Sequence, residues 1–163
     1  MSRLKDKVAI ITGAGDGIGR GIALAFTREG EKVAVCDLNK ATVHKTEAMI
    51  RQSGADVIAE PIDIRRPADI QSFVRNVKDH FGRIDCQVNN AAVMPVEPAE
   101  SIDPETIDQI LQVNLRAPIL FNRFVIPHMR DAGGGSIIHM ASVTGHNGHP
   151  GITVYGTQKN END

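Results

Sequence analysis

Tyr155 and Lys159 are the residues whose types and spacing most directly indicate chemistry. They stand four apart, so on a helix their side chains would lie on the same face, one turn from each other. A free tyrosine, with a pKa near ~10, accepts protons poorly at neutral pH, but a neighbouring cation favours its ionised form. The pair therefore indicates a phenol that takes up a proton with the help of an ammonium group. The alternative is a chance pair on a helix surface.

A second chemical signal is the glycine-rich stretch TGAGDGIG over residues 12–19. It follows the apolar, β-branched run KVAIIT and opens a helical pattern. Gly13 and Gly17 permit backbone geometries closed to other residues, and Gly19 lets the helix approach the sheet closely. The helix N-terminus would then offer free N–H groups to a pyrophosphate. The stretch predicts a dinucleotide site, and a glycine-rich turn without a ligand is the alternative.

Asp37 closes the next predicted strand, KVAVCD over residues 32–37. An acidic residue about 20 positions after such a loop can accept hydrogen bonds from both hydroxyls of an adenosine ribose. Its charge, with that of Asp16 in the loop, would repel a 2′-phosphate, and no Arg or Lys directly follows Asp37. We therefore expect NAD as the cofactor, with NADP disfavoured. The alternative is that Asp37 only caps a turn.

The elements that must position these residues alternate along the chain. Strand-like apolar runs are expected over 7–12, 32–37, 56–63, 84–91 and within 133–142. Helical patterns separate them, after the glycine loop, over 40–52, from Pro67 to Phe81 and from Pro104 to about Met129. Repeated strand–helix alternation predicts a parallel sheet with helices on both faces. The expected fold is α/β, a Rossmann-type doubly wound sheet in three α/β/α layers, with residues 1–163 as a single domain.

Composition disfavours several other classes of protein. The 18 basic and 20 acidic residues give a net charge of −2, which does not favour nucleic acid or a membrane surface as a partner. No apolar run approaches the roughly 18 residues of a membrane span, and the N-terminus lacks the features of a signal peptide. Cys36 and Cys86 suggest buried, reduced thiols, and His146 and His149 lack a third ligand for a metal. We expect a cytoplasmic protein without a metal.

Four motifs together resemble the short-chain dehydrogenase/reductase family over the whole chain. They are the glycine spacing G-x-x-x-G-x-G, NNAA at 89–92, Ser142 after the fifth strand, and YGTQK at 155–159. The resemblance, with Asp16 added from the loop, implies a cofactor site of Gly13, Asp16, Gly17, Ile18, Gly19, Asp37, Asp63, Ile64, Asn90, Ala91, Ala92, Tyr155 and Lys159. It implies four catalytic residues, namely Asn114, Ser142, Tyr155 and Lys159.

The implied reaction interconverts a secondary alcohol and a ketone. A nicotinamide takes the hydride while the tyrosine takes the hydroxyl proton. Ser142 would hydrogen-bond the substrate oxygen, and Lys159 would also hold the nicotinamide ribose. The expected partner is thus a small alcohol or ketone, and members of the family are usually homo-oligomers.

Asn114 has an independent argument from backbone chemistry. Pro118 stands four residues later and has no N–H to donate to the Asn114 carbonyl. We expect an irregular helix at 114–118 and a carbonyl free to bind a water, which fits the proton relay of the resembled family. The alternative is a kink that serves packing only.

Three features depart from the family pattern. Gln87 stands in a strand expected to be buried, where an unpaired amide would cost roughly 1–3 kcal/mol. Gln158 precedes the lysine, where a small residue is usual. Only NEND follows Lys159, so we expect the family's last strands and helices, its substrate loop and part of its dimer contact to be missing. The fifth strand would then be an exposed edge, and the tyrosine helix would be short.

Three functions stay open at this point. The first is an NAD-dependent oxidoreductase of alcohols and ketones. The second is a truncated, inactive dinucleotide-binding fragment or interaction protein. The third is an NADP-linked reductase of 3-oxoacyl chains, against which Asp16 and Asp37 count.

Overall fold

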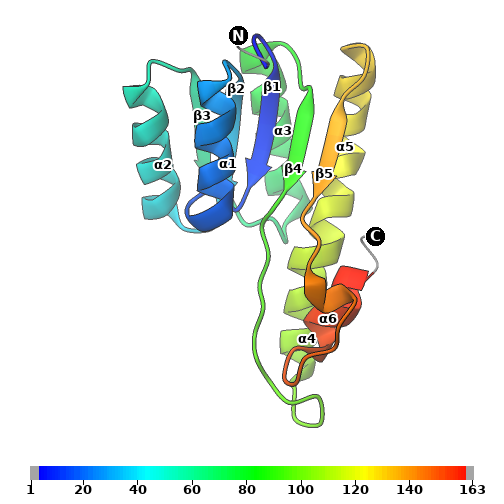
Figure 1. Ribbon diagram of the computed structural model, residues 1–163. Coiled ribbons are helices and arrows are strands. Elements are labelled where there is room, and N and C mark those ends of the chain that lie inside the picture. Colours follow the sequence, from blue (N-terminus) through cyan, green and yellow to red (C-terminus); the bar gives the residue numbers. More distant parts are fainter. Residues whose placement is uncertain (1–3, 161–163) are drawn as a thin grey trace.

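Five parallel strands form the central sheet of the structure, a computed structural model that describes residues 4–160 (Figure 1). In chain order the strands are β1 (Val8–Thr12), β2 (Lys32–Asp37), β3 (Val57–Pro61), β4 (Cys86–Asn89) and β5 (Ser136–His139). Their order in the sheet is β3-β2-β1-β4-β5, and every neighbouring pair is parallel. The order reverses between β1 and β4. Ligands of open α/β sheets bind at the carboxyl ends of the strands where such a reversal occurs.

Helices cover both faces of this sheet, as Figure 1 shows. The major helices are α1 (Gly17–Arg28), α2 (Lys40–Gln52), α3 (Pro67–Phe81), α4 (Pro104–Leu111) and α5 (Ala117–Asp131). A π-helical segment (Gln112–Arg116) joins α4 to α5, a 3₁₀ turn η2 (Val143–Gly145) follows β5, and α6 (Thr153–Asn160) comes last. Throughout residues 4–160, each helix is too short or too polar to cross a membrane. The predicted three-layer α/β/α fold is confirmed.

The alternation of side chains along β1 explains why two helical layers form. Ile10 joins the core that α3 and α5 cover, whereas Ile11 joins the core beneath α1 and α2. All five residues of β1 are buried, as expected for a central strand of a parallel sheet. The two apolar cores hold the sheet in the middle and fix the positions of its carboxyl ends.

Local sequence signals set the ends of the helices more closely than those of the strands. The bounds predicted for α2 and α3 match the structure, and Gly82 ends α3 in the left-handed conformation with φ of 79°. The fourth strand is shorter than predicted and ends at Asn89. Asn90 leaves the ladder because its side-chain amide donates to the Thr12 carbonyl, at 3.0 Å, and to the Gly13 carbonyl, at 3.1 Å.

The last elements agree only in part with expectation. β5 is the edge of the sheet and is half exposed, as predicted. The tyrosine lies on a helix of eight residues, α6. Of the NEND segment that follows Lys159, Glu161, Asn162 and Asp163 lie outside the described residues. Cys36 is buried, but Cys86 is only half-buried, contrary to expectation.

The buried amide of Gln87 is half satisfied. Its Nε2 donates to Asn89 Oδ1 at 3.0 Å, while its Oε1 has no partner among the described residues. Asn89 continues the chain of contacts, since its Nδ2 lies 3.3 Å from Asn122 Oδ1 and 3.4 Å from His139 Nδ1. Burial, and then the charge of Lys159, lower the pKa of His139, which favours the neutral ring in this network. The predicted free-energy cost of burying the Gln87 amide is therefore reduced, because Nε2 is hydrogen-bonded, but it is not removed, because Oε1 is not bonded within the described part of the chain.

Glu31 is a buried acid at the opposite end of the sheet, directly before β2. Its side chain is 3% exposed, and its Oε2 has no partner within the described residues. It lines a cavity of about 570 Å³ together with Lys7, Asp85 and Cys86. Burial raises the pKa of Glu31 to about 7; the charge of Asp85 adds to this rise, and that of Lys7 opposes it.

The Glu31→Gln substitution is expected to remove a pH-dependent term from the free energy of unfolding. The folded protein holds the Glu31 proton up to about pH 7, whereas the unfolded chain releases it near 4.5, so this term falls as pH rises between those values. The fall amounts to at most about 3 kcal/mol. Urea unfolding of both proteins at about pH 5 and about pH 8 checks it. The variant should gain stability relative to the parent at the higher pH, and an equal difference at both pH values would contradict the assignment.

Candidate cofactor and catalytic site

A cavity of about 400 Å³ opens at the carboxyl ends of the strands, where the sheet order reverses. The loops that follow β1 to β4 supply most of its wall, and α4 and the π-helical segment supply the rest. Eight predicted cofactor residues line it: Gly13, Asp16, Asp37, Asp63, Ile64, Asn90, Ala91 and Ala92. Five predicted residues, Gly17, Ile18, Gly19, Tyr155 and Lys159, are not part of its wall. The remaining residues of the wall were not predicted: Leu38, Ile62, Arg65, Val93, Gln109 and Val113.

The glycine loop is held against β4 by close backbone packing. A Cβ on Gly19 would lie 2.3 Å from the Gly13 carbonyl oxygen, so only glycine fits there without moving the loop. Thr12 Oγ1 accepts hydrogen bonds from the N–H groups of Asn90 and Ala91, both at 3.1 Å. The structure therefore builds one rigid edge of the cavity from two segments far apart in the sequence.

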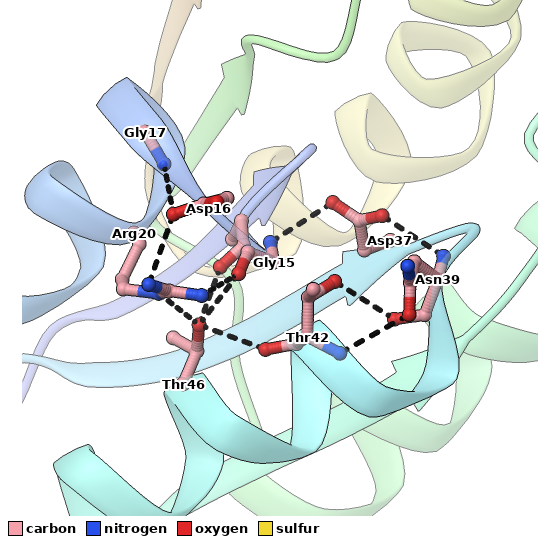
Figure 2. Close-up of polar contacts among 9 residues, drawn as sticks. Gly15, Asp16, Gly17, Arg20, Asp37, Asn39, Thr42 and Thr46 are labelled. Carbon is pink, nitrogen blue, oxygen red and sulfur yellow. Dashed lines mark hydrogen bonds and ion pairs between the residues drawn. The ribbon is translucent and has the colours of Figure 1, made fainter.

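Asp37 was expected either to bind a ribose or only to cap a turn, and its position in the structure is compatible with both. Its Oδ2 accepts from Gly15 N–H at 2.9 Å, and its Oδ1 accepts from Asn39 N–H at 3.0 Å (Figure 2). It thus caps the turn after β2, and it also lines the cavity. An ionised carboxylate has about four acceptor sites. Two remain for hydroxyl groups of a ligand.

Arg20 holds the glycine loop in place, a role that was not predicted from the sequence. Its Nη1 lies 2.9 Å from Asp16 Oδ1, its Nε donates to Thr46 Oγ1 at 2.9 Å, and its Nη2 donates to the Gly15 carbonyl (Figure 2). The spacing of Asp16 and Arg20, four residues apart at a helix start, was the available signal. Because Arg20 offsets the charge of Asp16, the repulsion of a 2′-phosphate expected from Asp16 is weakened. The prediction of NAD over NADP therefore rests mainly on Asp37.

Asn114 lies 2% exposed inside the π-helical segment, so the helix is irregular where predicted. Its side-chain amide clamps the backbone of Val93, accepting from the Val93 N–H and donating to the Val93 carbonyl, both at 2.8 Å. The Asn114 carbonyl accepts from outside the long helix, since Gln158 Nε2 donates to it at 3.2 Å. A carbonyl oxygen has two lone pairs, so the water expected on it stays a prediction.

Lys159 and Tyr155 are close in space, as their spacing predicted. The Lys159 ammonium lies 5.6 Å from the centroid of the Tyr155 ring and donates a hydrogen bond to the Met140 carbonyl. Lys159 is 5% exposed, and burial lowers its pKa. Met140 N–H in turn donates to the Asn89 carbonyl at 3.1 Å. The ammonium is therefore anchored at the carboxyl ends of β4 and β5, beside the wall of the cavity.

Ser142 is placed next to this pair by a close contact of α6 with η2. A Cβ on Gly156 would lie 2.9 Å from the Thr144 carbonyl oxygen, so glycine allows the approach. The Ser142 hydroxyl accepts from Thr144 Oγ1 at 2.9 Å and from the Thr144 N–H at 3.3 Å. Among the described residues, the hydrogen bonds found for the Ser142 hydroxyl thus come from Thr144 rather than from Tyr155.

Asp37→Asn is expected to raise the affinity for NADPH relative to NADH about five- to tenfold, because it removes a charge facing a 2′-phosphate. Asp16→Asn is the matched control and should change this ratio less, since Arg20 already offsets Asp16. The chain has no tryptophan, so cofactor fluorescence can be followed in a titration with little interference. Equal changes in the two variants would contradict the role given to Asp37.

Comparison with known proteins gives matches over nearly the whole chain. The sequence model of the short chain dehydrogenase family matches residues 7–161. An uncharacterized oxidoreductase of Bacillus subtilis is 36% identical over 156 residues, which are 96% of this chain and 61% of that protein. Galactitol 2-dehydrogenase of Agrobacterium fabrum is 39% identical over 158 residues, 96% of this chain and 60% of that protein. The crystal structure of NAD⁺-bound xylitol dehydrogenase superposes with a TM-score of 0.93 at 29% identity, covering 97% of this chain and 61% of its own.

The chain thus spans 60% or 61% of the length of these relatives. The matched part contains the parallel sheet, the glycine loop and the segment that carries Tyr155. On this sequence match and this fold, the chain belongs to the short-chain dehydrogenase family.

Proposed function

We propose that the protein is an NAD-dependent oxidoreductase that interconverts a secondary alcohol and a ketone. One observation carries the proposal. The Lys159 ammonium is buried between the Tyr155 ring and the Met140 carbonyl, at the strand ends beside the cavity. The ammonium and the phenol thus lie side by side on one helix, the arrangement that a tyrosine base with a lysine partner requires.

The residues present fit a dinucleotide. The glycine cradle, in which a Cβ on Gly19 would meet the Gly13 carbonyl, leaves room for a pyrophosphate near the N-terminus of α1. Asp37 keeps acceptor sites for ribose hydroxyls, and Asp63 and Ile64 line the same cavity. Arg65 also lines it, but its guanidinium pairs with Asp63 at 2.6 Å, which leaves it less able to serve a 2′-phosphate. These contacts support NAD over NADP.

The chain's own groups have separate tasks in the proposed reaction. A bound nicotinamide would supply the hydride acceptor. In the ionised form that the reaction needs, Tyr155 takes the proton from the substrate hydroxyl as the hydride leaves the carbon that bears it, and the Lys159 ammonium stabilises the phenolate before this transfer. Ser142 accepts from Thr144 and so keeps its own hydroxyl hydrogen, which it donates to the substrate oxygen. Asn114 holds the wall of the cavity through Val93.

The substrate class we propose is a polyol. Relatives of this chain bear the names galactitol 2-dehydrogenase, sorbitol dehydrogenase and D-threitol dehydrogenase, at 39%, 37% and 39% identity. Each of these names denotes a sugar alcohol with adjacent hydroxyl groups. Galactitol and sorbitol are therefore the first substrates to test.

Tyr155→Phe is expected to lower turnover of a polyol with NAD by at least about a hundredfold, because it removes the proton acceptor. The ring beneath Lys159 remains, so NADH affinity should stay near that of the parent. Formation of NADH from NAD and galactitol or sorbitol, with NADH binding as the control, measures both effects. Turnover retained in the variant would exclude Tyr155 as the base, and absence of turnover in the parent protein would count against the proposed function itself.

A further inference from the structure

The carbonyl of Asn114 lacks the donor that a regular α-helix would supply. Pro118, at the position that normally donates to it, has no N–H, and the segment is π-helical there. Buried carbonyls are almost always hydrogen-bonded. Gln158 Nε2 supplies a donor at 3.2 Å across 44 residues of sequence.

The side chain of Asn114 is committed to the cofactor cavity. Both of its polar atoms bond the backbone of Val93, at 2.8 Å each, and Val93 lines the cavity. A single residue therefore touches the cavity wall through its side chain and helix α6 through its carbonyl.

Helix α6 depends on such contacts for its position. It has eight residues, fewer than the ~12–15 at which isolated helices become marginally stable. Among its described side chains, Gln158 and Lys159 are the buried ones, at 2% and 5% exposure. Gln158 reaches Asn114 in the long helix, and Lys159 reaches Met140 after β5. Two neighbouring side chains thus fasten α6 to two different elements. Figure 1 shows α6 beside α4, at the start of the long helix.

Gln158 lines a groove of about 200 Å³ with Leu111, Leu115, Thr153, Val154 and Thr157. A methionine of similar length can fill such a space. Burying an amide there is favourable only if it makes hydrogen bonds. The bond from Gln158 Nε2 to the Asn114 carbonyl supplies one of them.

We propose that Gln158 is a positioning residue, which holds Tyr155 and Lys159 in register with the cofactor cavity through the Asn114 carbonyl. The inference rests on the proposed function for its catalytic consequence.

The test compares Gln158→Met, which removes the donor and keeps the volume, with Thr157→Ala on the exposed side of the same helix turn. Tyr155 is the single tyrosine and tryptophan is absent, so intrinsic fluorescence reports on α6 alone. We expect acrylamide to quench Tyr155 several-fold more efficiently in Gln158→Met and equally in Thr157→Ala. We further expect kcat to fall about ten- to a hundredfold in Gln158→Met, with a smaller rise in KM for NAD because Lys159 is also a predicted cofactor residue.

Gln158→Glu separates positioning from packing. A carboxylic acid can donate to the Asn114 carbonyl, but a carboxylate cannot. The kcat of this variant relative to the parent should therefore recover as pH falls, whereas the relative kcat of Gln158→Met should stay constant with pH.

The outcomes distinguish the inference from the function on which it rests. Parent-like quenching in Gln158→Met would overturn the inference whether or not the parent oxidises alcohols. If Tyr155 is quenched more in Gln158→Met but the parent protein shows no turnover, the anchoring is supported and the proposed function is refuted. If the ratio of the kcat of Gln158→Glu to that of the parent does not change with pH, Gln158 acts through packing alone and the inference is overturned.

Discussion

The backbone carbonyl of Asn114 is the group on which the geometry of the candidate catalytic site depends. Pro118 withholds the N–H that a regular helix would supply, and the chain responds with a π-helical segment and a donor from Gln158. The same residue clamps Val93 through its side chain. One local defect in a long helix thus joins the cavity wall to the short helix that carries Tyr155 and Lys159.

The cofactor side of the site relies instead on the sheet. Two apolar cores hold β1 between helical layers, and the reversal of strand order opens the cavity beside it. Short polar contacts then fix its rim, from Asn90 to the Thr12 and Gly13 carbonyls and from Asp37 to Gly15 N–H. This half is supported by buried strands, whereas the half carrying Tyr155 is supported by a few hydrogen bonds. The two halves should therefore differ in how strongly single substitutions disturb them.

The sequence predicted what local chemistry determines. The apolar spacing of α2 and α3 set both helices, and the missing N–H of Pro118 located the irregular helix. Contacts between distant residues were not predictable in this way. The early end of β4 follows from bonds of Asn90 to Thr12, and the role of Gln158 follows from a partner 44 residues away. Likewise, the sequence showed Gln87 only as a departure from the family pattern. Its hydrogen bond to Asn89 was not predictable, because that bond depends on the geometry at the end of β4.

A double-mutant cycle between Pro118 and Gln158 tests the central claim most directly. Pro118→Ala restores an N–H that can compete for the Asn114 carbonyl, so Gln158→Met should then cost less free energy of unfolding. Urea unfolding of the parent, both single variants and the double variant gives the coupling energy. The proposed anchoring predicts a coupling of about 0.5–1.5 kcal/mol, the usual worth of one hydrogen bond. Equal costs of Gln158→Met in both backgrounds would contradict it and would separate Gln158 from the carbonyl of Asn114.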